Sequence, residues 1–527
     1  MPARLAWLCI ALDKGPARNA NIVSAPGKPS AQHLSRFANA VERVEGSAVG
    51  FASFVALLGS VIMFRVVLEE LVTRPAELTP TLVFASNSLT FYLSAFLSAT
   101  LLVTLLTGGR VEKASKSVLV AFIATSVAPI FDYFFTRAPF YNYIYNPSVS
   151  LSSPNWGYLL WAFARFGTGV SGVTVGIQTE VLVFAALATA YVYFKTSSIP
   201  RTIAAPFAVY ALVLFYAGVP DYFSFGFEYQ VFNAAHNGQY YSSIFAFLIT
   251  AQGLAWLWLY HPGKFRGILR RLANQRSLHY LGLTAFGAYL GGAGWYPALL
   301  AMLCVLTLWF AASLVNDAMD LRGDELSKRA NPMVDGTISA GELQGAALFG
   351  AMSALLVSAI LGYAAFVIAL TVLAVSEAYS VPPLRLKKFP GVSNALIAAG
   401  ALLAFALGYL AGNVRVAIPT GLATAIFLGF ALASSTKDLK DYHGDKATGV
   451  WTVPVLLGQR RGRVAVALLD FAGFGVVALI LSPAKLLFPG LLLGAATVVF
   501  VVRGSREWVV FVPYFLFFVL VVALIYP

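Results

Sequence analysis

Two short acidic stretches carry the residues best suited to chemistry in this sequence. The first spans 316–324 and the second 437–445, and the aspartates in each stand three and then four residues apart. On a helix, this spacing stacks the carboxylates on one face. Like charges placed so closely need cations or abundant water, so each stretch alone could be a solvated helix end or a cation site. The residues are Asn316, Asp317, Asp320 and Asp324 in the first stretch, and Asp438, Asp441 and Asp445 in the second.

The repetition of this pattern favours a shared function over two solvated helix ends. Mg²⁺ in proteins is commonly held by one or two carboxylates together with substrate phosphate oxygens. We therefore interpret the two stretches as facing walls that hold a diphosphate through Mg²⁺. Metal ions stabilise the negative charge that develops when the C–O bond of an allylic diphosphate breaks. We expect all six aspartates to be catalytic and metal-binding, Mg²⁺ to be the cofactor, and an isoprenyl diphosphate to be a substrate.

Basic residues near the two stretches could help to neutralise the departing diphosphate. Each of them alone is more simply explained as an ordinary cation of an inner membrane loop. A prenyl chain is pure hydrocarbon, so the other end of its site should be a cavity that opens towards lipid. The basic candidates are Lys328, Arg329, Arg385, Lys387, Lys388, Lys437 and Lys440.

The elements that position these residues are expected to be membrane-spanning helices. The chain of 527 residues is 59% hydrophobic and only 11% charged, whereas a soluble domain is about 25% charged. Apolar runs of about 17–25 residues recur along it, long enough to cross a hydrocarbon core and too long for barrel strands. We therefore predict an all-α, polytopic membrane protein. The predicted spans are 48–68, 82–107, 118–136, 179–194, 203–219, 241–260, 278–294, 296–316, 343–360, 363–379, 393–411, 417–436, 464–481, 486–502 and 508–525.

The distribution of basic residues gives these fifteen spans an orientation. Inner loops of membrane proteins are enriched in Lys and Arg. When the N-terminus is placed inside, the inner loops hold all of the 36 Lys and Arg residues except Arg65, Arg74, Arg137, Arg165, Arg415 and Lys485. The net charge of +13 is therefore mainly a topology signal and does not imply nucleic-acid binding. We expect a multi-pass integral membrane protein with both aspartate stretches on the cytoplasmic side.

The chain divides into four parts. Residues 1–47 are interpreted as a basic cytoplasmic tail, in preference to a cleaved signal peptide, because their apolar run is short. Residues 48–262 form an N-terminal transmembrane domain of unknown role. Residues 263–277 form a basic linker, which would suit a helix on the inner surface near anionic lipid. Residues 278–527 hold both aspartate stretches and are expected to carry the chemistry.

The motifs of this last part resemble those of the UbiA superfamily of intramembrane prenyltransferases. The first stretch is similar to the family's N-D-x-x-D-x-x-x-D signature, and the second resembles its later D-x-x-D-x-x-x-D signature. Residues 379–388, YSVPPLRLKK, look like its Y-S-x-P-P-x-R-L-K connection between the fourth and fifth helices. The resemblance covers about 275–527. It implies a UbiA-type bundle of nine transmembrane helices, here preceded by an extra membrane domain of about six helices.

Residue roles follow from the same resemblance. It implies that the six aspartates supply or surround the metal sites, and that Asn316 assists the first site. The substrate-binding candidates are Asn316, Arg329, Tyr379, Arg385, Lys387, Lys437 and Lys440. The family usually places an arginine directly before a proline after the first signature. Here Asn331 precedes Pro332, and we expect Arg329 to replace that arginine.

The implied activity is the Mg²⁺-dependent transfer of a polyprenyl group from an isoprenyl diphosphate to a lipophilic acceptor. On this basis the acceptor can be a glycerol ether lipid or an aromatic or quinone precursor. Two other classes stay open. A membrane transporter would suit fifteen spans, although acidic residues at helix ends and the lack of a visible repeat disfavour it. A non-catalytic lipid-binding protein is the other alternative.

Overall fold

The structure is a computed structural model in which the described residues form helices and no strands. The described residues are 29–73, 82–135, 161, 163–168, 173–224, 237–272, 275–327, 331, 333, 338–412 and 417–526. The chain divides into two compact units, 1–47 and 48–527. Within the first unit, part of the predicted tail forms helix α1 (Pro29–Gly46).

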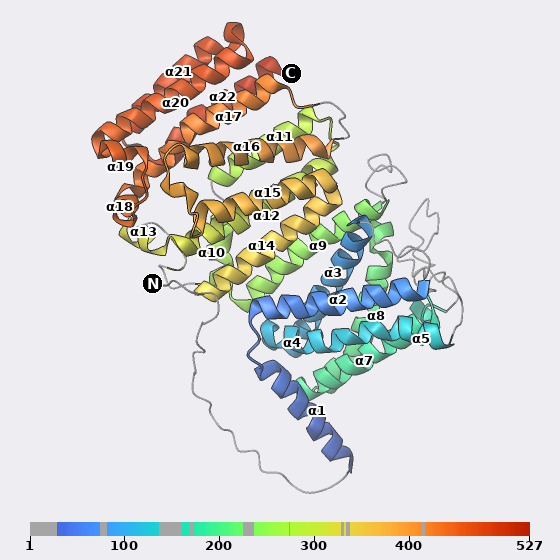
Figure 1. Ribbon diagram of the computed structural model, residues 1–527. Coiled ribbons are helices and arrows are strands. Elements are labelled where there is room, and N and C mark those ends of the chain that lie inside the picture. Colours follow the sequence, from blue (N-terminus) through green and yellow to red (C-terminus); the bar gives the residue numbers. More distant parts are fainter. Residues whose placement is uncertain are drawn as a thin grey trace. The chain divides into compact units, whose positions relative to one another are not determined.

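Helices α2 to α9 build the N-terminal half of the second unit (Figure 1). Their bounds are α2 Phe51–Thr73, α3 Leu82–Thr107, α4 Val111–Ala121, η1 Phe122–Ser126, α5 Val127–Phe135, α7 Val175–Thr196, α8 Ile199–Ser224 and α9 Asn237–Tyr260. α4, the 3-10 turn η1 and α5 follow one another directly and form one apolar stretch, Val111–Phe135. Helix α10 (Pro262–Leu272) occupies most of the predicted linker.

The described part of the C-terminal half contains nine long helices. They are α11 Gln275–Leu290, α12 Trp295–Met319, α14 Ala340–Leu361, α15 Tyr363–Ser380, α16 Val392–Ala411, α17 Thr420–Ala433, α20 Gln459–Leu481, α21 Pro483–Val502 and α22 Glu507–Ile525. α12 packs along α14, α11 along α16, and α20 along α21 (Figure 1). The shorter elements between them are α13 Leu321–Leu326, η4 Leu386–Lys388, η5 Ser434–Lys437, α18 Asp438–Thr448 and α19 Val453–Leu457.

Among the described residues, 14 helices are long and apolar enough to cross a membrane. The predicted span that does not qualify is the one at 278–294, because α11 has only 16 residues and is about 24 Å long. It ends before Gly292, which adopts φ +66°, a conformation that glycine accepts readily. The all-α, polytopic architecture is confirmed, and α11 begins three residues before the predicted span and ends four residues before its end.

Glycines allow α11 to lie very close to α16. A Cβ atom on Gly287 would collide with the Phe405 backbone, and one on Gly408 would collide with the Thr284 carbonyl group. Small residues permit such close backbone contacts between membrane helices. This contact holds α11 firmly in the bundle, where it forms one wall of the candidate site.

The two halves of the second unit share a core. α2, α3 and α9 all contact α14. Ala246 and Phe247 of α9 pack in one apolar cluster with Leu300 and Val357 of the C-terminal half. The Ser243 and Tyr296 hydroxyl groups share a hydrogen bond of 2.5 Å across the same contact. The predicted boundary between a transmembrane domain at 48–262 and a catalytic domain at 278–527 therefore stays a prediction.

Candidate active site

The first aspartate stretch lies where α12 ends and α13 begins. Asp320, with φ −103° and ψ 9°, separates the two helices. Helical hydrogen bonds nevertheless continue across it, because the Asp320 amide donates to the Asn316 carbonyl group (3.0 Å) and the Asp324 amide donates to that of Asp320 (2.9 Å). The spacing predicts that these polar side chains share one face of a single helix. In the structure they lie on two consecutive helices, α12 and α13, and the helical hydrogen bonds continue from one to the other.

The second stretch forms the start of α18. The 3-10 turn η5 connects it to α17, so Asp438 is its first residue, and Asp441 and Asp445 follow on the same helix. Carboxylates of both stretches are buried: Asp438 is 4% exposed, and Asp317 and Asp324 are 3% and 4% exposed. Buried charges require hydrogen bonds, counter-charges or bound ions, so this concentration of carboxylates points to a cation-binding region.

Packing of α13 against α18 brings the two stretches together. The Gly444 amide donates to the Ser327 hydroxyl oxygen (2.9 Å). A Cβ atom on Gly444 would lie 3.0 Å from the Gly323 carbonyl carbon, closer than the ~3.5–4.0 Å at which carbon atoms pack. Asp445 lies near enough to Asp320 for their charges to interact. The two stretches therefore face each other across a contact that only glycine permits.

A cavity of about 700 Å³ begins at the two stretches, and its volume falls within the ~300–1,000 Å³ range of small-molecule sites. The predicted site residues that line it are Asn316, Asp317, Asp320, Asp324, Tyr379, Lys387, Lys437, Asp438, Lys440, Asp441 and Asp445. Beyond them the lining is mostly apolar and includes Leu283, Phe286, Val305, Leu407, Leu422, Ile426 and Val521. Arg385 is not among its lining residues, and Arg329 lies outside the described residues.

Two cations of the connection between α15 and α16 bind the first stretch. The Lys387 ammonium group donates to the Asn316 side-chain oxygen (2.9 Å) and pairs with Asp320 (2.5 Å). The Arg385 guanidinium group pairs with Asp320 from the other side (3.2 Å). Arg385 adopts φ +38°, an uncommon conformation for a residue other than glycine. Such local strain is typical of functional sites.

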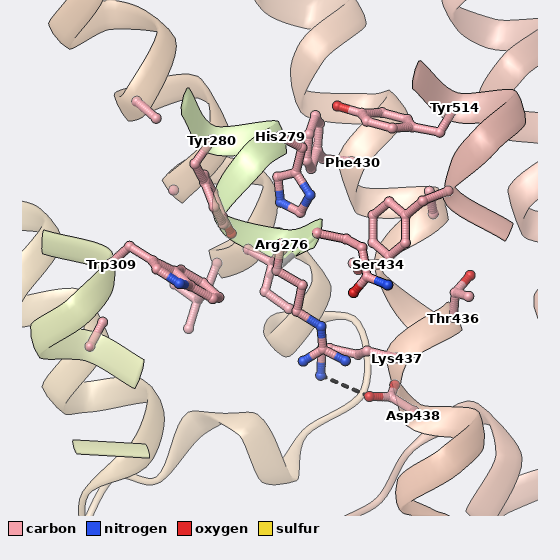
Figure 2. Close-up of a pocket in the computed structure, with 18 of the residues that line it drawn as sticks. Arg276, His279, Tyr280, Trp309, Phe430, Ser434, Thr436, Lys437, Asp438 and Tyr514 are labelled. Atoms are coloured by element: carbon pink, nitrogen blue, oxygen red, sulfur yellow. Dashed lines mark hydrogen bonds and ion pairs between the residues drawn. The ribbon is translucent and has the colours of Figure 1, made fainter. Parts of the chain in front are cut away.

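Lys437 performs the corresponding role at the second stretch. Its ammonium group lies 2.7 Å from the Asp438 carboxylate and donates to the Tyr379 hydroxyl oxygen at 3.2 Å. Figure 2 shows Lys437 beside Asp438 in the pocket. Lys440 pairs with Glu507 at the start of α22 (2.5 Å). Both walls of the cavity mouth therefore carry cations next to carboxylates, as a site for an anionic ligand held through metal ions requires.

Arg276 and Glu507 belong to the site but are not among the predicted site residues. Arg276, at the start of α11, lines the cavity and donates through Nε and Nη2 to Glu507 at 2.9 and 2.8 Å. Its charge also reaches Asp438. In the sequence, Arg276 is one of several basic residues in the predicted linker. Nothing in the sequence distinguishes Glu507, because its partners are far away along the chain.

Asn331 is another site residue whose role the sequence pattern does not reveal. It is fully buried, and its side-chain amide donates to the Asp317 carbonyl group (3.0 Å) and to the Asp324 carboxylate (2.8 Å). In the sequence it appears only as the residue that replaces the expected arginine before Pro332. In the structure its side chain binds the first aspartate stretch at both Asp317 and Asp324.

The donor atoms fit Mg²⁺ better than they fit a closed metal site. Among the described residues, no group of three or more His, Cys, Asp or Glu side chains could hold a metal ion alone. A structural zinc site would need such a group. Carboxylates on two facing walls instead suit a hard cation that uses one or two of them and completes its coordination with substrate oxygens.

Comparisons with known proteins agree with this architecture. Residues 280–519 match the UbiA prenyltransferase family. The digeranylgeranylglyceryl phosphate synthase of Natronomonas pharaonis is 31% identical over 235 residues, which cover 42% of this chain and 77% of that protein. The enzyme of the same name from Methanoculleus marisnigri is 30% identical over 237 residues, 40% of this chain and 82% of that protein. A UbiA homologue from Archaeoglobus fulgidus, bound to DMAPP and Mg²⁺, shares 22% identity at a TM-score of 0.39, over 49% of this chain and 98% of its own.

The 14 long apolar helices define a multi-pass integral membrane protein. With the two synthases as relatives, the chain belongs to the UbiA prenyltransferase family. It is a prenyltransferase, so the transporter and the non-catalytic lipid-binding protein are excluded as alternatives. Residues 1–279 lie outside the family match.

Proposed function

We propose that the protein transfers a polyprenyl group from an isoprenyl diphosphate to a hydroxyl group of a glycerol ether lipid, with Mg²⁺ held between the two aspartate stretches. The observation that carries this proposal is that both stretches meet at the mouth of one largely apolar cavity. The carboxylate-lined end suits a metal-bound diphosphate, and the apolar end suits a hydrocarbon chain.

The residues at the cavity mouth would have three different roles: metal binding, hydrogen bonding to the diphosphate, and positioning of other side chains. Asp317, Asp320, Asp324, Asp438, Asp441 and Asp445 would hold Mg²⁺, with Asn316 orienting the first stretch. Bound Mg²⁺ supplies stabilisation of the negative charge on the leaving diphosphate. Lys387 and Lys437, one on each wall, would donate charge-assisted hydrogen bonds to the diphosphate oxygens. Arg385 would act by positioning Asp320, and Tyr379 by positioning Lys437.

The depth of the cavity supports a long prenyl chain. On α12, cavity-lining residues run from Asp317 to Val305, about 18 Å along the helix, and on α22 from Glu507 to Val521, about 21 Å. An extended chain advances about 1.2 Å per bond, so this depth corresponds to about sixteen bonds, or four isoprene units. The donor that fits this depth is a geranylgeranyl diphosphate.

The nature of the acceptor is inferred from the relatives. Two relatives with 30–31% identity are digeranylgeranylglyceryl phosphate synthases, whose name describes a glyceryl phosphate that carries two geranylgeranyl groups. A protein of this kind would add a prenyl group to a glycerol hydroxyl. We therefore propose a glyceryl phosphate with one prenyl ether chain as the acceptor, in preference to an aromatic or quinone precursor.

We also propose that the site opens on the cytoplasmic side. Arg276 ends the basic linker, and it pairs with Glu507, which also binds Lys440 of the second stretch. The basic linker and the aspartate stretches therefore lie at the same face of the helix bundle. Basic linkers are enriched on the cytoplasmic side of membranes.

The role proposed for residues 48–262 is that of an accessory membrane domain. Its helices α2, α3 and α9 pack against α14, and α14 packs along α12, which carries the first aspartate stretch. The domain would thereby support the helix that positions Asp317. This is a mechanical role and does not require a ligand of its own.

The experiment is a transfer assay on membranes that contain the protein. They are incubated with labelled geranylgeranyl diphosphate, Mg²⁺ and geranylgeranylglyceryl phosphate, and the labelled lipid is identified by mass spectrometry. The proposal predicts a diether lipid that forms only with Mg²⁺. A labelled aromatic product from endogenous lipid, with no diether, would refute the acceptor. The absence of any labelled prenyl product would refute the proposed activity.

A further inference from the structure

His279 lines the cavity and has no role in the proposed function as stated so far. It lies on α11 one turn beyond Arg276, and Figure 2 shows its ring beside Tyr280 and Phe430. The ring centroids of these two neighbours lie 4.5 and 5.4 Å from that of His279. Phe511 stacks on it at 5.8 Å with an interplanar angle of 19°. The imidazole is therefore held in one orientation by aromatic rings from three helices.

No hydrogen bond joins the imidazole to any residue that the structure describes, and its buried Nδ1 has no partner. Polar side chains in protein interiors are nearly always hydrogen-bonded. A neutral imidazole has one N–H group and one nitrogen lone pair available for this purpose. Because Nδ1 is buried from the cavity as well, Nε2 is the imidazole nitrogen that can bind a polar group of the ligand.

The place of His279 in the cavity indicates which group that would be. Arg276, whose charge reaches Asp438, belongs to the polar end of the cavity, and Leu283 and Phe286 belong to the apolar part. His279 lies about 4.5 Å further along α11 than Arg276, between these two regions. The reacting carbon of a prenyl diphosphate joins the diphosphate to the hydrocarbon, so it must lie at the same boundary.

The carboxylates of the cavity wall could also accept a proton, but each has a partner or an assigned role. Both carboxylate oxygens of Asp470 accept from the Thr436 hydroxyl group, at 2.9 and 2.8 Å. Glu507 is paired with Arg276 and Lys440. The six aspartates are assigned to Mg²⁺ by the proposed function. Of the described side chains in the cavity wall that could accept a proton, His279 is the one with neither a hydrogen-bond partner nor a role in binding Mg²⁺.

We propose that His279 is the general base that removes the proton from the acceptor hydroxyl group; this rests on the proposed function. The C1–O bond of the prenyl diphosphate breaks and its electron pair leaves with the diphosphate. A lone pair of the acceptor oxygen forms the new C1–O bond, and the hydroxyl proton moves to the imidazole, which returns it to water. The products are an ether, diphosphate and one proton.

Two charged residues act on the imidazole, Arg276 on the same helix and Glu507 on α22. Arg276 opposes the positive charge that the imidazole gains, and Glu507 favours it with the smaller effect. Tyr280 and Tyr514 also face the ring, and their faces can stabilise a nearby cation.

The test compares His279→Gln and His279→Ala with wild type, and uses Ser376→Ala as a control that removes a hydroxyl group from the wall of the same cavity. Two rates are measured with geranylgeranyl diphosphate, geranylgeranylglyceryl phosphate and Mg²⁺: formation of the diether, and release of diphosphate in the absence of acceptor. His279→Ala is also assayed with added imidazole. Thermal unfolding and binding of geranylgeranyl diphosphate show whether each variant is folded, and His279→Asn replaces a variant that is not.

General bases contribute about 10²–10⁴-fold to rates, and a loss of this size in diether formation is expected for both His279 variants. Diphosphate release without acceptor should stay near the wild-type rate, because breaking the C1–O bond does not require a base. Imidazole should restore part of the activity of His279→Ala, and Ser376→Ala should retain wild-type rates. Wild-type diether formation by His279→Gln, or an equal loss of both rates without rescue, would overturn this inference alone. A wild-type protein that forms no diether would overturn the proposed function and this inference together.

Discussion

Replacement of Gly444 by alanine tests whether the distance between the two aspartate stretches controls the reaction. The new methyl carbon would lie 3.0 Å from the Gly323 carbonyl carbon and would also collide with the Gly323 oxygen and the Ser327 hydroxyl group. Since carbon atoms pack at ~3.5–4.0 Å, α18 must move away from α13 by about 0.5–1 Å. Gly323 lies on the short helix α13 and Gly444 on the short helix α18. A shift of α18 therefore changes the distance between the two metal-binding aspartate stretches.

A misplacement of about 1 Å can lower a rate by about 10²-fold, whereas overpacking of this kind costs about 1–3 kcal/mol of stability. Gly444→Ala should therefore remain folded but lose about 10²-fold in turnover, and it should need more Mg²⁺ for half-maximal activity. The assay is diether formation at increasing Mg²⁺ concentrations, together with thermal unfolding in detergent.

Gly323→Ala is the matched control on the facing helix. Its methyl group would lie 3.7 Å from the Thr448 side chain, an ordinary contact distance, so this variant should keep wild-type activity. Equal activity of Gly444→Ala and wild type would refute the reasoning. An equal loss in both variants would also refute it, because the spacing would then not depend on the close contact at Gly444.

Three further predictions concern the site and its support. Asp320→Ala and Asp441→Ala should each lose at least about 10²–10³-fold in turnover, because each removes charge that stabilises the departing diphosphate; near-normal activity of both variants with intact folding would contradict their assigned roles. Asn331→Leu should lower stability by about 1–3 kcal/mol, because it removes a hydrogen-bond donor from the buried Asp324 carboxylate; an unchanged unfolding temperature would disagree. Removal of residues 1–262 should reduce the yield of folded enzyme, because it removes the packing of α2, α3 and α9 against α14 and the Ser243–Tyr296 hydrogen bond; unchanged expression and kinetics would show that this half has no part in the reaction.

The fold was predictable from sequence because membrane helices depend on local composition. Long apolar runs specify spanning helices without reference to distant residues, and the structure contains all the predicted C-terminal helices within its described residues. The end of α11 lies at a local signal, because Gly291 and Gly292 follow Leu290 and Gly292 adopts φ +66°. The close approach of Gly291 to the Tyr409 backbone on α16 is a tertiary contact that the local sequence does not contain.

The candidate site was predictable where its residues form a local pattern. The aspartates stand at helical spacing, so both stretches could be recognised, and Lys387 and Lys437 lie beside recognisable motifs. Arg276, His279 and Glu507 could not be identified in this way. Each is a single residue of an ordinary type, and it joins the site only because α11 and α22 pack beside α17 and α18.

The central claim is that both aspartate stretches hold one diphosphate through divalent ions. The most direct measurement is the binding of Mn²⁺, used in place of Mg²⁺, to the purified protein by electron paramagnetic resonance, with and without geranylgeranyl diphosphate. We predict that tight Mn²⁺ binding requires the diphosphate and that it is lost in Asp320→Ala and in Asp441→Ala alike. Wild-type binding of Mn²⁺ and diphosphate by either variant would contradict the claim, because one stretch would then be sufficient.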